Sequence, residues 1–237
     1  PGSYSTIPCD NWSMKDNLGI AFGAIIENAN GSSKSDQIFG NASDNILNGG
    51  SGDDILKGGE GNDLFDWKES SSAGADTFYG EAGDDVFVVD SPSDSIVEFI
   101  NEGSDLVWVE VEEYTLPDNV ERLGSMLKTA VRLYGNSLDN EIRGNLGSDF
   151  LNGADGNDII YGGGGDDNIT GGLGDDTLFG EAGLDNFLFF PNFGNDVISD
   201  FNEAEDNIFF DGVALSDISD VEQTVLEDGF KVLSFLD

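Results

Sequence analysis

Histidine is absent from this chain of 237 residues, and cysteine occurs once, as Cys9. Without histidine, neither a Ser–His nor a Cys–His catalytic pair can form. A zinc site is also not expected, because zinc prefers histidine and cysteine ligands. A lone cysteine cannot close an internal disulfide, so the fold is not stapled by a disulfide framework.

Basic residues are scarce as well. The chain has 9 Lys and Arg against 48 Asp and Glu, which gives a formal net charge of −39. A surface this acidic repels nucleic-acid phosphates and anionic lipid headgroups, so we expect no nucleic-acid partner and no membrane insertion. The same charge attracts cations.

Long apolar runs are also missing. No stretch of about 18 apolar residues could form a transmembrane helix, and no basic segment precedes an apolar core as in a cleavable signal peptide. The chain starts at Pro1 and not at Met, which predicts a fragment or a processed product. Its 38% hydrophobic content still permits a core.

Glycine is what the chain has in abundance, with 33 residues, and most of them fall into a repeat of nine. The first set of repeats begins with GSSKSDQIF at Gly31 and reaches GEAGDDVFV, with WKES at 67–70 interrupting it. The second set runs without a break from GNSLDNEIR at Gly135 to GEAGLDNFL, which ends at Leu188. The shared pattern is G-G-x-G-x-D-x-U-x, whose positions we number as places one to nine.

Two places of the repeat carry the structural signal. The sixth place is Asp or Asn, and the eighth is always a large apolar residue. The sixth-place residues are Asp36, Asn45, Asp54, Asp63, Asp76, Asp85, Asn140, Asp149, Asp158, Asp167, Asp176 and Asp185. The eighth-place residues are Ile38, Leu47, Leu56, Phe65, Phe78, Phe87, Ile142, Leu151, Ile160, Ile169, Leu178 and Phe187.

This spacing predicts an all-β fold. Places seven to nine suit a strand of about 10 Å with one side chain facing inward, and places one to six form a turn. Two nonapeptides then make one flattened coil, and stacked coils pair as parallel strands about 4.8 Å apart around a narrow apolar core. We therefore predict a right-handed parallel β-roll, a type of β-solenoid.

The turns are predicted to bind calcium. Glycines at places one, two and four allow positive φ and direct carbonyl oxygens between neighbouring turns, where the sixth-place aspartate adds a carboxylate. An all-oxygen cage suits Ca²⁺, which takes about six ligands at 2.3 to 2.6 Å, better than Mg²⁺, which retains its waters. Turns on one edge lie two repeats apart, which predicts the pairs Asp149–Asp167, Asp158–Asp176, Asp167–Asp185 and Asn45–Asp63.

Counting such pairs gives about five to eight Ca²⁺ ions. The candidate carboxylate ligands are Asp54, Asp63, Asp76, Asp85, Asp149, Asp158, Asp167, Asp176 and Asp185. The candidate glycines are Gly49, Gly50, Gly52, Gly58, Gly59, Gly61, Gly162, Gly163, Gly165, Gly171, Gly172 and Gly174.

These repeats resemble the RTX (repeat-in-toxin, haemolysin-type) family of calcium-binding β-rolls, for which the same nonapeptide is a known signature. The resemblance implies export by a type I secretion apparatus, an uncleaved C-terminal signal, and folding triggered by extracellular calcium. GIAFGAIIENANG at 19–31 further resembles the lead-in to the β-roll of serralysin-type secreted metalloproteases. Because this chain lacks histidine, the catalytic zinc domain of such an enzyme would have to lie elsewhere.

The repeats divide the chain into five segments: lead-in strands at 1–30, a first β-roll block at 31–108, a connector at 109–134, a second block at 135–188, and a capping segment at 189–237. Weak turns are expected at the start of each block, where Asn45 and Asn140 replace aspartate. The interruption at 67–70 is expected to end one set of sites and restart the next. Residues 89–108 are expected to form further coils without strong metal sites.

The capping segment is predicted to cover the open end of the roll, whose last strand would otherwise expose a pairing edge. The phenylalanines expected to do so are Phe189, Phe190, Phe193, Phe201, Phe209 and Phe210.

The function expected from these features is that of a secreted, extracellular calcium-binding module, monomeric, which supports the secretion and stability of a partner domain such as a protease. The alternative is a calcium-dependent polysaccharide-binding or adhesive module, which an exposed stripe of Tyr, Trp and Arg along one sheet would support. Paired carboxylates can hydrolyse glycosides, but the repeat already accounts for the pairs here, so we expect no catalysis.

Overall fold

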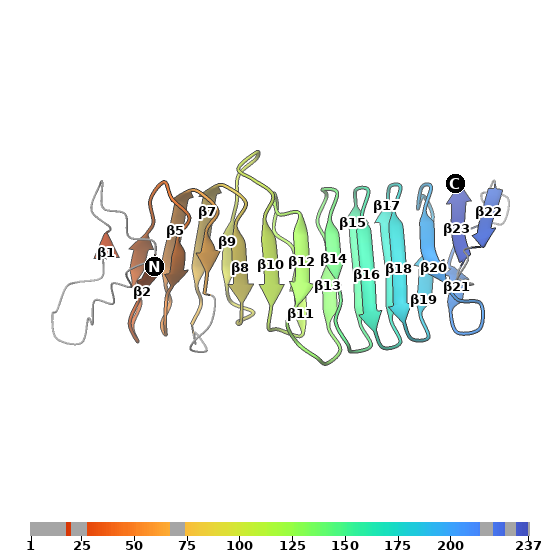
Figure 1. The fold of residues 1–237 in the computed structure, drawn as a ribbon, viewed down its shortest axis with the longest axis horizontal. Coiled ribbons are helices and arrows are strands. Elements are labelled where there is room, and N and C mark those ends of the chain that lie inside the picture. The colour runs from red at the N-terminus through yellow and green to blue at the C-terminus, as the bar shows by residue number, and fades with distance from the viewer. Residues whose placement is uncertain (1–17, 20–27, 67–73, 214–219, 226–230, 237) are drawn as a thin grey trace. The chain divides into compact units, whose positions relative to one another are not determined.

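A computed structural model describes residues 18–19, 28–66, 74–213, 220–225 and 231–236. Every regular element in these ranges is a β-strand, as Figure 1 shows, and none of them contains a helix that could cross a membrane. The chain forms two compact units, Pro1–Val111 with Pro117–Asn119, and Glu112–Leu116 with Val120–Asp237. We call them the first and second unit.

The first unit contains two sets of parallel strands. One set is β1 (Leu18–Gly19), β3 (Gln37–Phe39), β5 (Ile55–Glu60), β7 (Thr77–Ala82) and β9 (Ser95–Val97). The other is β2 (Asn28–Asn30), β4 (Ile46–Asn48), β6 (Leu64–Phe65), β8 (Val86–Val89) and β10 (Leu106–Val109). Strands adjacent in sequence therefore alternate between the sets, as in a solenoid.

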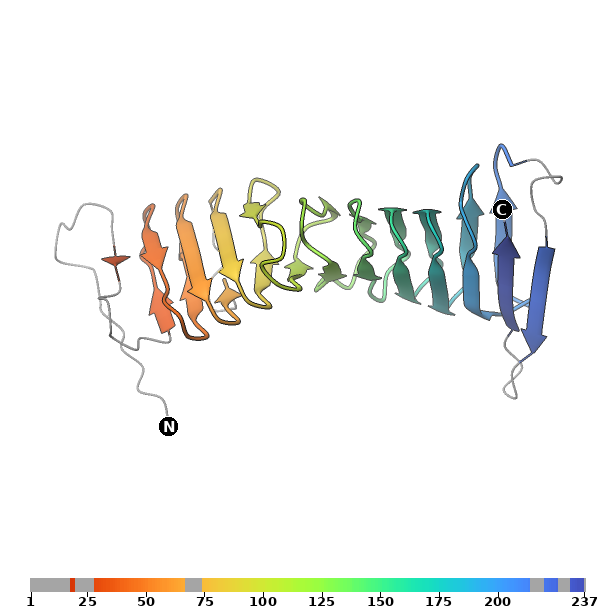
Figure 2. The same cartoon turned by 90° about the horizontal axis from the view of Figure 1, so that it is seen from above.

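The second unit repeats this arrangement, and Figure 2 shows its coils following one another as separate rungs. One sheet is β11 (Glu113–Thr115), β13 (Arg132–Tyr134), β15 (Phe150–Asp155), β17 (Asn168–Leu173), β19 (Asn186–Phe189) and β21 (Asn207–Phe210). The opposite sheet is β12 (Arg122–Ser125), β14 (Glu141–Arg143), β16 (Ile159–Gly164), β18 (Thr177–Ala182), β20 (Val197–Phe201), β23 (Lys231–Leu236) and β22 (Asp220–Val225). All these pairings are parallel except β20–β23 and β22–β23.

The strand register confirms two nonapeptides per coil. Ile142 pairs with Ile160, and Leu151 pairs with Ile169, so that partners lie 18 residues apart. The all-β parallel solenoid predicted from the sequence is therefore the fold. Across the interruption the register also holds, because Leu56 pairs with Phe78 at a separation of 22 residues.

The predicted core is confirmed. All twelve eighth-place side chains have 0% exposure. The core of the first unit contains an aromatic cluster: the rings of Phe65 and Phe87 stack with centroids 4.8 Å apart, and the ring of Phe78 lies 5.9 and 6.1 Å from them. The second unit fills the same place mainly with Ile and Leu.

The strands of the regular repeats are longer than the three residues predicted. β5 and β15 to β18 each have six residues, because pairing resumes after place one. Asn152 pairs with Thr170, and Ala154 then pairs with Gly172, whereas the glycines between them are not paired. The residues at places two and three are thus part of the sheet, and the residue at place one is the one that is left unpaired.

Outside the repeats the chain continues to coil. Residues 89–108 contribute β9 and β10, as expected, and 109–134 contain β11, β12 and β13.

In the last coils Phe189 and Phe193 are buried, whereas Phe190 and Phe209 are 46% and 50% exposed. Most of the serralysin-like lead-in at 19–31 lies outside the described residues, because 20–27 are not among them.

Candidate metal centre

A ladder of hydrogen bonds joins the sixth places of neighbouring coils. The backbone N–H of Asp158 donates to Oδ1 of Asp176 at 2.8 Å. The N–H of Asp149 donates likewise to Asp167 at 2.7 Å, that of Asp167 to Asp185 at 3.0 Å, and that of Asn45 to Asp63 at 2.7 Å. The structure therefore brings together all four pairs named from the sequence.

The ladder also crosses the interruption at 67–70. The N–H of Asp54 donates to Oδ1 of Asp76 at 2.8 Å, and the N–H of Asp63 donates to Oδ1 of Asp85 at 2.7 Å. The four additional residues lie outside the described part of the chain, and β5 and β7 on either side of them remain paired. The turns on the two sides of the interruption therefore remain neighbours, and the expectation that one set of metal sites ends there stays a prediction.

The second carboxylate oxygen of these residues has a different environment. In several aspartates that are at most 1% exposed, Oδ2 is buried and accepts no hydrogen bond from any described residue. These are Asp54, Asp63, Asp85, Asp158, Asp167, Asp176 and Asp196. Burying an ionised carboxylate without a partner costs several kcal/mol, so each such oxygen calls for a proton or a cation.

The backbone at place two decides whether Oδ2 stays free. In the turn that ends at Asp167, Gly163 has φ of +103°, and Oδ2 of Asp167 receives no hydrogen bond from the described residues. Place two has positive φ in seven turns, which we call open turns. The residues concerned are Gly50, Gly59, Glu81, Ala154, Gly163, Gly172 and Glu181.

The first two turns of each block are built differently. The N–H of Asn145 donates to Oδ2 of Asp149 at 2.8 Å, and the N–H of Ser32 donates to Oδ2 of Asp36 at 2.6 Å. Oδ1 of Asn45 and of Asn140 accept in the same way from Asn41 and Asn136. None of these four donors has positive φ. We call these closed turns, because a backbone N–H of the same turn donates a hydrogen bond to this side-chain oxygen.

Place one completes the geometry of the open turn. A Cβ added to Gly162 would fall against Oδ2 of Asp167 and the carbonyl oxygen of Gly180 in the next coil. The same two kinds of oxygen converge on Gly153, from Asp158 and Gly171. Only glycine leaves this space open. We call it the cradle.

The other predicted glycines have equivalent roles. Gly49, Gly58 and Gly171 face Oδ2 of the aspartate in their own turn, as Gly162 does. Place four has positive φ in both blocks, which brings its backbone against the neighbouring coil. The place-four glycines predicted as ligands are Gly52, Gly61, Gly165 and Gly174, and the place-two glycines are Gly50, Gly59, Gly163 and Gly172.

The charge in the turns has no basic counterpart nearby. Arg143 forms an ion pair with Glu141, and this pair is exposed on β14, away from the turn carboxylates. Burial, aided by neighbouring carboxylates, raises the pKa of Asp63, Asp158 and Asp167 to about 7 although backbone hydrogen bonds lower it. The turns are therefore strongly electronegative and short of compensating charge.

These donors fit calcium. Carboxylate and carbonyl oxygens converge in each cradle, and no nitrogen or sulfur ligand is present there. Among the described residues no group of three or more acidic or cysteine side chains is placed to hold a metal by itself. A cation in a cradle would therefore be held largely by backbone carbonyls, which is what the glycine-rich turn provides.

The sequence analysis names no carboxylate beyond the regular repeats as a metal ligand, but the structure continues the ladder there. Asp94 and Asp105 accept from the N–H groups of Asp76 and Asp85, and Asp196 accepts from Asp176. Their spacings of 18 and 20 residues continue the ladder after the glycines have faded. A search for aspartate two residues before a buried apolar residue, without regard to glycine, finds all three.

Comparison with known protein families agrees with this geometry. Four copies of the RTX calcium-binding nonapeptide repeat match residues 30–65, 70–95, 134–169 and 161–188, which together make up about half of the chain. No curated protein matches the sequence.

Proposed function

Because this chain belongs to the family of RTX calcium-binding repeats and folds as a parallel β-roll, we propose that it is a secreted module that folds when it meets extracellular calcium. The observation that carries the proposal is the row of buried Oδ2 atoms without hydrogen-bond partners in successive open turns of the described chain. Each of these oxygens opposes folding when its carboxylate is ionised and no cation is bound. Each favours folding once a cation binds to it.

The free energy of calcium binding is large enough to switch the module between unfolded and folded states. A site that binds calcium only in the folded state adds about 1.4 kcal/mol when calcium is at ten times its Kd, and several sites add up. Extracellular calcium modules bind at about 10⁻⁴ to 10⁻³ M, far above cytosolic calcium. With a net charge of −39 the chain stays expanded inside the cell and folds outside.

We propose that each ion lies between two neighbouring turns of one edge, with the aspartates and glycines named above as ligands and about five to eight ions in all. The module would be monomeric and would reach the exterior through the type I secretion machinery. It would stabilise a partner domain, for example a protease, and carry no catalysis itself.

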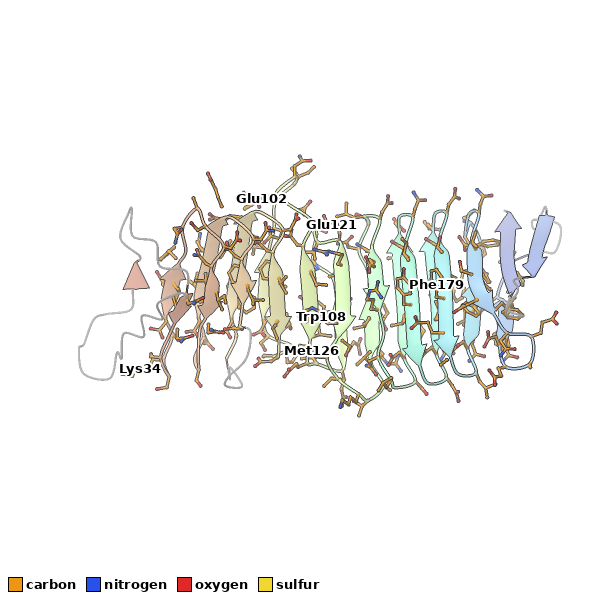
Figure 3. The ribbon with its side chains drawn as sticks, viewed as in Figure 1. Lys34, Glu102, Trp108, Glu121, Met126 and Phe179 are labelled. Carbon is orange, nitrogen blue, oxygen red and sulfur yellow. The ribbon has the colours of Figure 1, made fainter. Side chains whose placement is uncertain are left out.

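The polysaccharide-binding alternative gains little from the sheet faces. Arg143, Tyr161 and Phe179 do form a column on β14, β16 and β18, and Figure 3 labels Phe179 on this face. However, Tyr161 stacks on Phe179 at 4.8 Å and carries Arg143 at 4.2 Å from its ring centre. Both ring faces of Tyr161 are thus covered within the column and are not available to a sugar ring.

The test is far-UV circular dichroism of chelator-treated protein during titration with CaCl₂, and with MgCl₂ as the control. We expect a cooperative gain of β signal near millimolar calcium that magnesium does not reproduce. A spectrum already folded in chelator and unchanged by calcium would refute the calcium-triggered folding.

A further inference from the structure

Glu98, which lies outside the matched repeats, is the most deeply buried glutamate described. Its side chain is 5% exposed, Oε1 accepts the N–H of Gly80 at 2.7 Å, and Oε2 is buried without a hydrogen-bond partner among the described residues. A residue used only to cap Gly80 would not need the second oxygen inside the protein.

Glu98 enters the cradle of the last regular turn of the first block. A Cβ added to Gly80 would fall against Oδ2 of Asp85 and Oε1 of Glu98. In the regular cradle at Gly162 the corresponding atoms are Oδ2 of Asp167 and a backbone carbonyl oxygen. A carboxylate thus stands where the repeat uses a carbonyl, which adds a negative charge to the cradle.

The surroundings of Glu98 supply no compensating charge. Its charged neighbours are Asp105, Asp85 and Glu102, and together with burial, the largest cause, they raise the pKa of Glu98 to about 8. Asp85 is 0% exposed, and its Oδ2 also lacks a hydrogen bond from the described residues. Figure 3 labels Glu102 at this edge of the first unit.

The second block contains a natural comparison. The turn GEAGDD at 80–85 recurs as GEAGLD at 180–185, and there Asp200 is the carboxylate from the following coil. Its Oδ1 accepts the N–H of Gly180 at 2.9 Å, and its Oδ2 accepts the N–H of Glu181 at 2.8 Å. Asp200 uses both oxygens on the backbone, whereas Glu98 keeps one free.

We propose that Glu98 and Asp85 form a divalent-cation site at the end of the first block, with Glu98 as a ligand that the nonapeptide pattern does not contain. Two carboxylates in one cradle favour a doubly charged, oxygen-preferring ion such as Ca²⁺. The site closes the row of cradles at a coil that has no glycine-rich turn of its own. The inference rests on the proposed calcium binding of the regular turns.

The experiment counts bound calcium by native mass spectrometry in wild-type protein, Glu98→Gln and Asp200→Asn. Glutamine keeps an oxygen for the Gly80 N–H but removes the charge. We expect Glu98→Gln to bind one ion fewer than wild type, and Asp200→Asn to bind the same number as wild type. Circular dichroism at saturating calcium verifies that each variant is folded.

The outcomes separate the two proposals. Equal ion counts in wild type and Glu98→Gln, with unchanged calcium midpoints, would overturn the role of Glu98 and leave the calcium-binding module intact. Loss of one ion in both variants would also overturn it, because capping of the turn would then be the cause. Wild-type protein that binds no calcium would overturn the proposed function, and the Glu98 site with it.

Discussion

Asp158 and Asp176 are joined by one hydrogen bond, from the N–H of the first to Oδ1 of the second, and each keeps its own Oδ2 buried without a partner among the described residues. One carboxylate oxygen thus fixes the spacing of the coils while the other faces the cradle. Because the two oxygens have different roles, the same aspartates hold the coils together and are candidates for metal binding.

The first prediction concerns Asp158→Asn. The amide keeps Oδ1 for the N–H of Asn140 but removes the charge and the free oxygen. We expect weaker calcium-dependent folding, by about 1.4 kcal/mol at tenfold excess calcium for one lost site. The calcium midpoint followed by circular dichroism measures this. The control is Asp155→Asn, because Asp155 is exposed in the same turn, and an equal shift in both variants would contradict the role of Asp158.

The second prediction uses two adjacent glycines. Gly163 has φ of +103°, and its Cβ would fall against the carbonyl oxygen of Asn145, so Gly163→Ala should destabilise the calcium-bound protein by about 1–2 kcal/mol or more. Gly164 lacks positive φ, and its Cβ would meet no atom closer than 3.5 Å. Thermal unfolding should therefore separate Gly163→Ala from Gly164→Ala, and similar melting temperatures would contradict the open-turn geometry.

Sequence reasoning succeeds here where one residue type has one role. The eighth place is apolar in every repeat because only that side chain points inward. The sixth place is buried in all repeats but the first, at Asp36, and its Oδ1 accepts an N–H from the preceding coil, as Asp167 does from Asp149. Glycine at place two is less informative. Glu81 and Ala154 adopt positive φ there without being glycine, so the open turn extends further than the pattern indicates.

The remaining features depend on contacts between coils that the nonapeptide does not encode. Asp105 and Asp196 continue the ladder at a spacing of 20, because the strands that follow them pair at the same spacing, Leu106 with Val86 and Val197 with Thr177. Asn145 closes its turn through its backbone N–H, which no residue type reveals. Glu98 reaches Gly80 from the following coil, a relationship that appears only once the coils are stacked.

The third prediction concerns the aromatic core of the first unit. Phe87 is fully buried and stacks on Phe65, so Phe87→Ala should cost about 3–5 kcal/mol of folding free energy in saturating calcium. Phe99 is 60% exposed, and Phe99→Ala should stay within about 0.5 kcal/mol of wild type. Denaturant unfolding measures both, and a small effect of Phe87→Ala would show that the first unit does not fold around this cluster.

The fourth prediction is that acid partly replaces calcium. Burial, the largest cause, raises the pKa of Asp63 and Asp167 to about 7 and that of Asp196 to about 8, above the value of about 4 expected in the unfolded chain. A raised folded-state pKa means that the fold favours the protonated form. In chelator, the contribution of these groups to stability is complete below about pH 4 and is lost as pH rises through about 7 to 8.

Metal-free protein should therefore be more folded at pH 5 than at pH 8, whereas calcium should rescue folding at pH 8. Circular dichroism and thermal unfolding in chelator across this range test the sign, with calcium-saturated protein at pH 8 as the reference. Because protons and calcium neutralise the same carboxylates, the calcium needed for folding should also fall as the pH is lowered from 8 towards 6. Metal-free stability that rises with pH over this range would mean that the buried carboxylates are not what prevents folding.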